Sequence, residues 1–252
     1  MIKLIRPEKP NQLTEDIAKV LTEEYINTGK AVWRKDYITE KLLEMSHGKC
    51  CYCEIKLNVQ SREMHVEHFH YKDKYKDEVV KWENLLPSCR QCNSNKGTLD
   101  TKEEQLIDPT VCNPRDFLFM QFFMIKSKDN ARDSIGYRTV EILDLNNRER
   151  LVNLRIELAD AMNNKLADTN DRLNDYMKDI NNARKKSRII RTIKDILNMA
   201  QPSAEFSAFL STFLLNSYDY IEIVKALKDL QLWDDELETL HNNSAIIKYE
   251  LK

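Results

Sequence analysis

The chain contains few of the residues that make tight turns. Its 252 residues include only four glycines and six prolines. Sandwiches and barrels need a turn roughly every ten residues, so this scarcity argues against both and favours long helices. A long apolar run is also missing, because no stretch approaches the roughly 20 residues that span a bilayer. Residues 1–6 lack the pattern of a secretory signal, and we therefore expect a cytoplasmic protein.

An excess of charge of either sign is absent as well. The chain has 39 lysines and arginines against 41 aspartates and glutamates, which gives a formal net charge of −2. A protein that binds nucleic acid usually carries a basic surface. Such a surface must here be local, or a partner must supply it. Charged residues still make up 32% of the sequence, which suits a protein rich in exposed helix.

Cysteine is concentrated in one part of the chain, with five of the six residues in or beside the stretch 50–97. Two pairs have the spacing C-x2-C and are separated by 35 residues: Cys50/Cys53 and Cys89/Cys92. A C-x2-C turn points both thiolates at one centre, so two such turns predict a closed tetrahedral site for structural Zn²⁺. Cys51 stands only two positions before Cys53, too close for a relaxed chelate loop. We interpret it as a small buried filler.

An acid–histidine pair, Glu67-His68, lies between the two cysteine pairs. Hydrolysis of a phosphodiester needs a base for the water and a cation against the phosphate. His68 fits the base because its ordinary pKa is near neutral. The carboxylate of Glu67 and the amide oxygen of Asn93 are hard ligands that suit catalytic Mg²⁺ or Mn²⁺. Lys96 is a candidate point charge for a substrate phosphate.

Two further histidines are candidate substrate contacts. His65 stands two positions before Glu67 and would share its face of a strand, and His70 stands two positions after His68. Taken singly, a histidine is more often an ordinary surface residue. What indicates a site is the coincidence of several such residues inside one zinc frame.

The order Glu67-His68, Asn84, Asn93 inside a four-cysteine frame resembles the HNH endonuclease family. Asn84 alone could be a turn former, but the resemblance implies that it braces the loop and orients the histidine. Segments across residues 48–146 are also similar to the nuclease subunit of Septu anti-phage systems, the PtuB-like proteins that also occur beside retrons. These segments are Gly48-Lys49-Cys50-x-Tyr52-Cys53-Glu54, Glu67-His68-Phe69, Trp82-Glu83-Asn84-Leu85-Leu86-x-Ser88-Cys89-x-x-Cys92-Asn93-x-x-Lys96-Gly97, Ile107-Asp108-Pro109 and Leu143-x-Leu145-Asn146.

The resemblance implies a DNA endonuclease that works with an ATPase subunit (PtuA-like). A retron reverse transcriptase and its nucleic acid are further candidate partners. Two alternatives remain from other classes: a non-catalytic zinc-stapled module that binds nucleic acid, and an adaptor with a vestigial HNH fold. The binding module would keep the four cysteines but would not need His68.

The expected fold class is mainly α with a small α+β element, a zinc-stapled ββα-metal module between helical segments. We expect an N-terminal arm and two helices over 1–49, the nuclease module over 50–100, and a connector and helical domain over 101–252. Apolar spacing predicts the first two helices within about 14–29 and 33–46. The first strand is expected within 62–70, and the helix after it near Cys92 or Asn93.

The C-terminal part has a helical pattern with one apolar stripe from Leu151 to Ile180, interpreted as the core of a bundle. An aromatic run near 117–126 predicts a single buried strand. We expect the helical region to contact the ATPase. One dense basic cluster offers an alternative role in binding phosphate: Arg184, Lys185, Lys186, Arg188 and Arg191.

Overall fold

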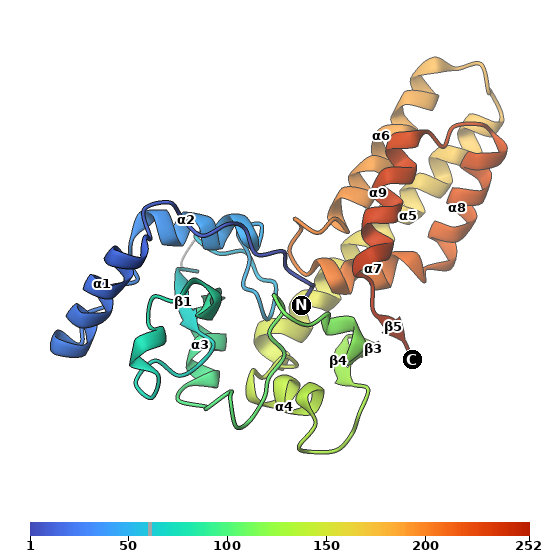
Figure 1. Ribbon diagram of the computed structural model, residues 1–252. Helices are drawn as coiled ribbons and strands as arrows, with labels where there is room; N and C mark the ends of the chain where they lie inside the picture. The colour runs from blue at the N-terminus through green and yellow to red at the C-terminus, as the bar shows by residue number, and fades with distance from the viewer. Residues whose placement is uncertain (60–61) are drawn as a thin grey trace. The chain divides into compact units, whose positions relative to one another are not determined.

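The structure is a computed structural model that describes residues 1–59 and 62–252. It confirms the predicted fold class: within those residues, nine α-helices accompany five short strands. The strands form two small sheets, one of order β1–β2 and one of order β4–β3–β5 (Figure 1). Among the described helices, none combines the length and apolar character that a membrane span requires.

The chain packs as two compact units. Unit 1 consists of Met1–Phe117 and Lys126–Leu145, and unit 2 consists of Leu118–Ile125 and Asn146–Lys252. Unit 1 therefore holds all described residues of the first two predicted segments. The third predicted segment, 101–252, is shared between the two units.

The two N-terminal helices, α1 (Glu15–Thr28) and α2 (Asp36–Met45), lie close to where the sequence predicts them. The Thr14 side chain accepts a hydrogen bond from the backbone N–H of Ile17 and so caps the start of α1. Gly29 ends the helix with a φ of 69°, a conformation that glycine adopts at little cost.

The buried face of α1 is narrower than the sequence suggests. The apolar residues Ile17, Val20, Leu21 and Tyr25 recur at the spacing of one helix face. Leu21 and Tyr25 are buried, whereas Ile17 and Val20 are 42% and 60% exposed. Part of this face packs against the short 3₁₀ helix η1 (Lys76–Glu78), which offers only a small contact surface. A short partner element buries fewer positions of the helix than the apolar spacing implies.

A ββα unit follows. Strand β1 (Met64–His68) pairs antiparallel with β2 (Leu85–Cys89), with His68 opposite Leu85. The 3₁₀ helix η2 (Trp82–Asn84) leads into β2, and helix α3 (Arg90–Lys96) leads out of it. α3 begins two or three residues earlier than predicted because the Cys89 thiol group acts as its N-cap, accepting from the backbone N–H of Cys92 at 3.4 Å.

The prediction of a single strand over 117–126 is wrong. Two strands occupy this stretch, β3 (Leu118–Gln121) and β4 (Met124–Ser127), and they are neighbours in one sheet. Phe122 lies between them with a φ of 52° and is 79% exposed, so the aromatic run contains a turn. The third strand, β5 (Glu250–Leu251), pairs parallel with β3 and was not predicted.

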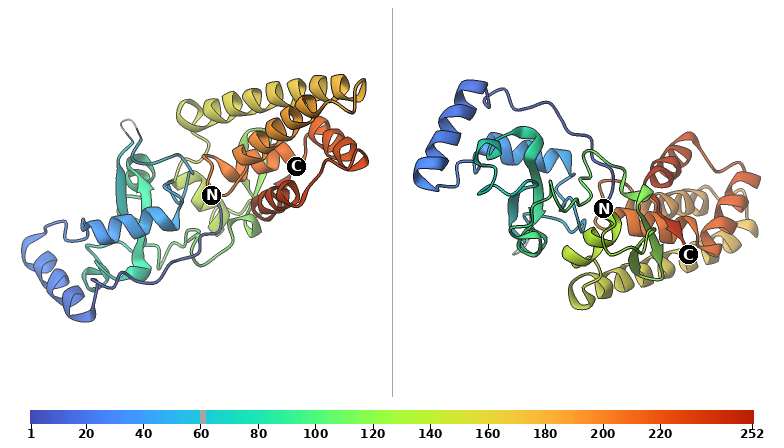
Figure 2. Two further views of the ribbon diagram at one scale, coloured as in Figure 1. Left: turned by 90° about the horizontal axis from the view of Figure 1, so that it is seen from above. Right: turned by 60° about the horizontal axis from the view of Figure 1, so that its bottom comes forward.

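The remaining helices are α4 (Ile135–Ile142) in unit 1 and five helices in unit 2: α5 (Asn153–Met177), α6 (Ala183–Met199), α7 (Ser207–Leu215), α8 (Tyr218–Asp229) and α9 (Asp235–Ile247). A short π-helical turn, Arg148–Val152, precedes α5. The short 3₁₀ helix η3 (Pro114–Asp116) precedes β3. Helices α5 and α6 pack against each other (Figure 2).

The apolar stripe that begins in the π-helical turn and continues along α5 forms a helical core, as predicted, but it ends earlier. Leu151, Leu166 and Leu173 are buried, whereas Met177 and Ile180 are 49% and 57% exposed. The helix stops at Met177, so the last predicted position lies outside it.

Candidate active site and metal centre

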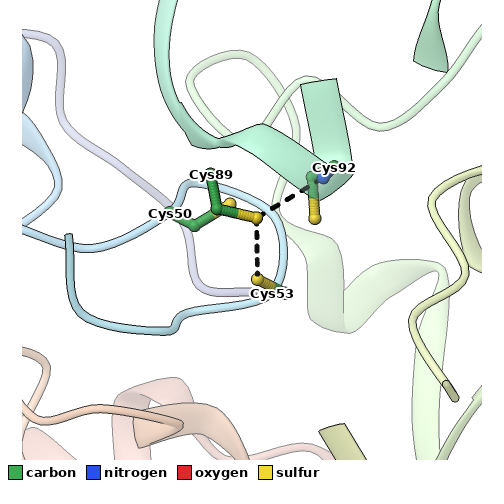
Figure 3. Close-up of side chains that lie close together, drawn as sticks. All are labelled: Cys50, Cys53, Cys89 and Cys92. Carbon is green, nitrogen blue, oxygen red and sulfur yellow. Dashed lines mark hydrogen bonds between the residues drawn. The ribbon is translucent and has the colours of Figure 1, made fainter. Parts of the chain in front are cut away.

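Four cysteines from two distant parts of unit 1 meet at one point. The sulfur atoms of Cys50, Cys53, Cys89 and Cys92 all lie within 4.8 Å of one another, and all four residues are buried (Figure 3). Cys53 Sγ is 3.8 Å from Cys89 Sγ. Four thiolates around one Zn²⁺ at about 2.3 Å would have their sulfurs about 3.8 Å apart. The geometry therefore fits the predicted closed zinc site.

The backbone around this cluster fixes the first cysteine turn against the sheet. Cys50 N–H donates to the Ile55 carbonyl at 2.9 Å, which closes the turn, and Cys51 N–H donates to the Pro87 carbonyl of β2 at 2.9 Å. The Cys51 side chain is buried but lies outside the four-sulfur cluster. Its position agrees with the interpretation of Cys51 as a filler.

A cavity of about 370 Å³ lies beside β1 and is lined by every residue from Glu63 to His68. In the described sheet β1 pairs only with β2, so its other edge is available to line a cavity. Helix α3 and its C-cap contribute Asn93, Lys96 and Gly97. The cavity thus brings together five residues predicted from the sequence: His65, Glu67, His68, Asn93 and Lys96.

His68 is held as a neutral imidazole. Its Nε2 lies 2.8 Å from the carbonyl oxygen of Val79. A carbonyl can only accept, so Nε2 carries the proton and Nδ1 keeps a lone pair. Burial lowers the pKa of His68 to about 4, and the Trp33 ring packs edge-on against the imidazole with 4.5 Å between ring centroids. At neutral pH the ring is therefore uncharged.

Glu67 is a buried carboxylate with a buried cation beside it. It is 1% exposed, and Lys96 Nζ lies 2.7 Å from its Oε1. Burial raises the pKa of Glu67 to about 7, and the Lys96 ammonium opposes this rise. Lys96 Nζ also donates to the His68 carbonyl at 2.8 Å. Lys96 was predicted to contact a substrate phosphate, but the residue is only 4% exposed and its ammonium is bonded inside the module.

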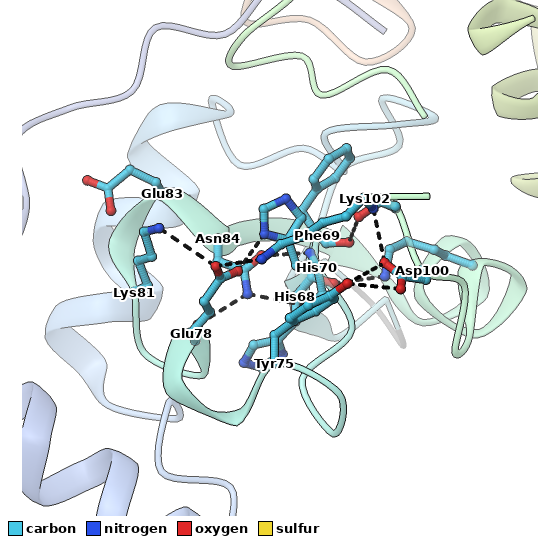
Figure 4. Close-up of polar contacts among 12 residues, drawn as sticks. His68, Phe69, His70, Tyr75, Glu78, Lys81, Glu83, Asn84, Asp100 and Lys102 are labelled. Atoms are coloured by element: carbon cyan, nitrogen blue, oxygen red, sulfur yellow. Dashed lines mark hydrogen bonds and ion pairs between the residues drawn. The ribbon is translucent and has the colours of Figure 1, made fainter. Parts of the chain in front are cut away.

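Asn84 bridges the two ends of the loop that follows β1 (Figure 4). Its Oδ1 accepts from the His70 backbone N–H at 2.6 Å, and its Nδ2 donates to the carbonyls of His70 at 3.3 Å and Glu78 at 3.1 Å. The His70 ring pairs with the Glu78 carboxylate at 2.5 Å, and Lys102 Nζ lies 2.9 Å from the same carboxylate. Neither Asn84 nor His70 lines the cavity, although both were predicted as site residues.

Sequence reasoning missed part of the cavity wall. Trp33, Arg34, Asp36 and Thr39, from the segment between α1 and α2 and the start of α2, line it together with Lys72. Their spacing follows no motif. The only signal in the sequence is an aromatic residue next to an arginine in a short connector. Such a pair also occurs in ordinary loops, so the local sequence pattern does not identify it as part of a site.

Comparison with known proteins agrees with this geometry. Residues 27–111 match the family model described as recombination endonuclease VII, a range that contains every residue lining the cavity. A protein of Bacillus thuringiensis described as Septu protein PtuB is 39% identical to this chain over 97% of the chain and 93% of its own length. The chain belongs to the Septu protein PtuB family.

A second PtuB relative, from Bacillus mycoides strain KBAB4, is 27% identical over 46% of this chain and 49% of its own length. These matches confirm the resemblance to the PtuB-like proteins stated from the motifs. They also identify the stretch with the cysteine cluster and the cavity as an endonuclease-type domain of a PtuB family member.

Proposed function

We propose that this chain is a metal-dependent HNH endonuclease that hydrolyses phosphodiester bonds in DNA. The observation that carries the proposal is the state of His68, a neutral imidazole with Nε2–H donated to the Val79 carbonyl and Nδ1 left to accept a proton. It lines the same cavity as Glu67 and Asn93. Base, acid and amide thus share one space of a size that a sugar–phosphate group can enter.

In this mechanism the residues have separate tasks. His68 Nδ1 takes a proton from the attacking water, and the hydrogen bond to Val79 keeps the ring in the required tautomer. Glu67 and Asn93 would hold Mg²⁺ or Mn²⁺, since a carboxylate and an amide oxygen suit a hard divalent ion. The buried Glu67 carboxylate already pairs with the cation of Lys96, in keeping with a group that binds positive charge. When bound, the ion would offset charge on the phosphate and leaving oxygen.

Asn84, Lys96 and His70 act around this centre. Asn84 closes the loop that carries Val79. It therefore positions His68 indirectly, because the Val79 carbonyl accepts the hydrogen bond from His68 Nε2. Lys96 joins the end of α3 to the end of β1, through the Glu67 carboxylate and the His68 carbonyl. His65 lines the cavity and is the histidine placed to contact substrate, whereas His70 supports the loop through Glu78.

The same proposal includes a partner and a role. As a member of the PtuB family, the chain acts in anti-phage defence as the nuclease subunit of a complex with an ATPase. Its net charge of −2 favours this arrangement, because the chain alone has little general attraction for DNA. Both relatives are described as Septu proteins, so the proposal names the ATPase as partner and does not extend to a retron.

Purified wild-type protein and a His68→Ala variant test the proposal, each with and without the ATPase. We expect DNA cleavage that requires Mg²⁺ or Mn²⁺ and is lost in His68→Ala, with zinc content and folding unchanged. His241→Ala, in unit 2, is the matched control and should cleave normally. If His68→Ala cuts DNA at the wild-type rate, the assignment of His68 as the general base is wrong. If the wild-type complex never cuts, the chain is a binding module or adaptor instead.

A further inference from the structure

One wall of the cavity comes from outside the ββα unit. The segment between α1 and α2 places Trp33 and Arg34 in the cavity lining, and Asp36 at the start of α2 lies beside them. The residues proposed above for catalysis all come from β1 and α3. The role of this N-terminal wall, formed by Trp33, Arg34 and Asp36, is therefore not explained by the catalytic residues.

This wall is fixed to the module by ring contacts. Val32 is 4% exposed, and the Trp33 ring packs against His68 with 4.5 Å between centroids. Trp33 also packs against Tyr25 of α1 at 5.6 Å, and the Tyr25 hydroxyl donates to the Asp73 carboxylate. The contacts of Trp33 with His68 and with Tyr25 therefore fix the backbone next to Arg34. The Arg34 side chain extends from this fixed position at the cavity.

The cations of the cavity differ in how much of their bonding capacity is already used. Lys96 is buried and committed to Glu67. Lys72 Nζ lies 3.4 Å from Asp73. Arg34 is exposed, and among the described residues no hydrogen bond or ion pair involves its guanidinium. The carboxylates in the lining are Asp36, Glu63 and Glu67. Their three negative charges balance the three positive charges of the lining. An anion would therefore be bound by individual side chains and not by a net positive charge of the cavity.

We propose that Arg34, with Lys72 beside the same cavity, forms a phosphate-binding subsite for the nucleic-acid strand that His68 cuts. A guanidinium presents a planar fork that can donate two hydrogen bonds to one phosphate, and an ammonium adds a point charge. Arg34 thus takes the role that the sequence suggested for Lys96. The inference rests on the proposed nuclease function and adds the residue that positions the strand.

The test measures DNA binding apart from cleavage. In the His68→Ala background of the full chain, the Kd for a short DNA duplex is measured by fluorescence anisotropy over a series of salt concentrations. Arg34→Ala should raise Kd by roughly 10-fold and lower the slope of log Kd against log salt by about 1, the change expected for one lost phosphate contact. Arg34→Lys should recover part of the affinity, because it restores the charge without the fork.

Lys35→Ala is the matched control. Lys35 is exposed and next in sequence, but it does not line the cavity, so its removal should leave Kd and the salt slope close to wild type. Zinc content and thermal melting are measured for each variant, and Arg34→Lys covers the case in which the alanine variant is misfolded. In the active background, Arg34→Ala should raise KM by the same factor.

The outcomes separate the two proposals. If wild type cleaves and Arg34→Ala binds DNA with unchanged Kd and salt slope, the subsite is wrong and the nuclease proposal stands. If wild type binds without cleaving and Arg34→Ala weakens binding, the subsite stands and the nuclease proposal fails. A wild-type protein with no affinity for DNA, either alone or in complex with the ATPase, overturns both.

Discussion

The imidazole of His68 is held by two contacts of different kinds. The hydrogen bond from Nε2 to the Val79 carbonyl sets the tautomer, and the edge of Trp33 restricts the rotation of the ring. A base works only when its lone pair is aimed at the water, and a small misplacement costs much rate. Trp33 is therefore a positioning residue for His68.

The first prediction concerns this contact. Trp33→Ala should lower kcat by roughly 10- to 100-fold with a smaller change in KM, because the ring positions the base rather than the substrate. Trp33→Phe should restore most of kcat, since it keeps an aromatic ring against His68. Steady-state kinetics of DNA cleavage measure both. Equal loss of kcat in the Phe and Ala variants, or a change confined to KM, would contradict the positioning role.

The second prediction concerns Asn84, which is 2% exposed and makes three hydrogen bonds to the backbone of His70 and Glu78. Asn84→Ala leaves these groups without the partner, and each unpaired buried group costs about 1–3 kcal/mol. We expect unit 1 to lose about 2–4 kcal/mol of unfolding free energy in urea titrations. Asn163→Ala, at an exposed site on α5, should change the unfolding free energy by less than about 0.5 kcal/mol. Equal effects of the two substitutions would argue against the brace.

At the scale of elements, the four-cysteine cluster joins three pieces of backbone: the turn that follows α2, the end of β2 and the first turn of α3. Cys89 has two roles, because its sulfur belongs to the cluster and also caps α3. A metal held by all four thiolates links the folding of these pieces to metal binding.

The third prediction follows from that linkage. Cys89→Ser should lose stoichiometric zinc and unfold the ββα unit, because three remaining thiolates from distant segments bind the ion more weakly. Cys51→Ser and Cys112→Ser lie outside the cluster and should keep full zinc content. Metal analysis and amide exchange of β1 and α3 measure both effects. A Cys89→Ser protein that still holds one zinc per chain would contradict the assignment of Cys89 as a zinc ligand.

Elements governed by local signals could be predicted from the sequence. Thr14 and Gly29 mark both ends of α1, and the two C-x2-C pairs indicate the zinc cluster without any tertiary information. Elements that depend on distant partners could not. The stretch 117–126 becomes two strands in a sheet whose β3 also pairs with β5 at the C-terminus, and the intervening turn uses Phe122 at positive φ instead of a glycine.

The site shows the same division. Motif spacing brings His68, Glu67 and Asn93 to one cavity, because β1 and α3 belong to one local unit. Spacing does not report burial, so the enclosed ion pair of Lys96 with Glu67 could not be read from it. Arg34 was missed because its place in the cavity depends on the packing of Trp33 on His68, a contact between residues 35 positions apart.

At the scale of the whole molecule, unit 2 is built from two separated stretches of chain. Arg155 of α5 donates to the Phe123 carbonyl at 3.1 Å, and Asn146 bonds both the N–H and the carbonyl of Ile125 at 2.8 and 2.7 Å. A truncation near residue 145 would remove these contacts and leave β3 and the start of β4 unsupported. Surface substitutions in unit 2 are therefore a sharper probe of its function than deletion.

The fourth prediction is that unit 2 makes the principal contact with the ATPase. Nuclease chemistry needs only the ββα unit, so a helical unit this large has another purpose. Tyr218 and Ile221 lie three residues apart on α8 and are 74% and 50% exposed, which makes them a candidate contact. The double variant Tyr218→Asp/Ile221→Asp should lose co-purification with the ATPase. Ile26→Asp, at a 51% exposed site on α1, should retain it. The reverse result would place the contact on unit 1.

The basic cluster on α6 is the competing use of the same unit. Arg184, Arg188 and Arg191 are exposed and recur at four and three residues, so they share one face of the helix, whereas Lys185 pairs with Asp175 at 3.0 Å. Replacing the three arginines by glutamate should leave both ATPase binding and DNA binding of the complex unchanged if the face is only solvated. Loss of the ATPase would add α6 to the partner contact. Weaker and less salt-sensitive DNA binding with the ATPase still attached would assign the cluster to the substrate, because each lost phosphate contact lowers the salt slope by about 1.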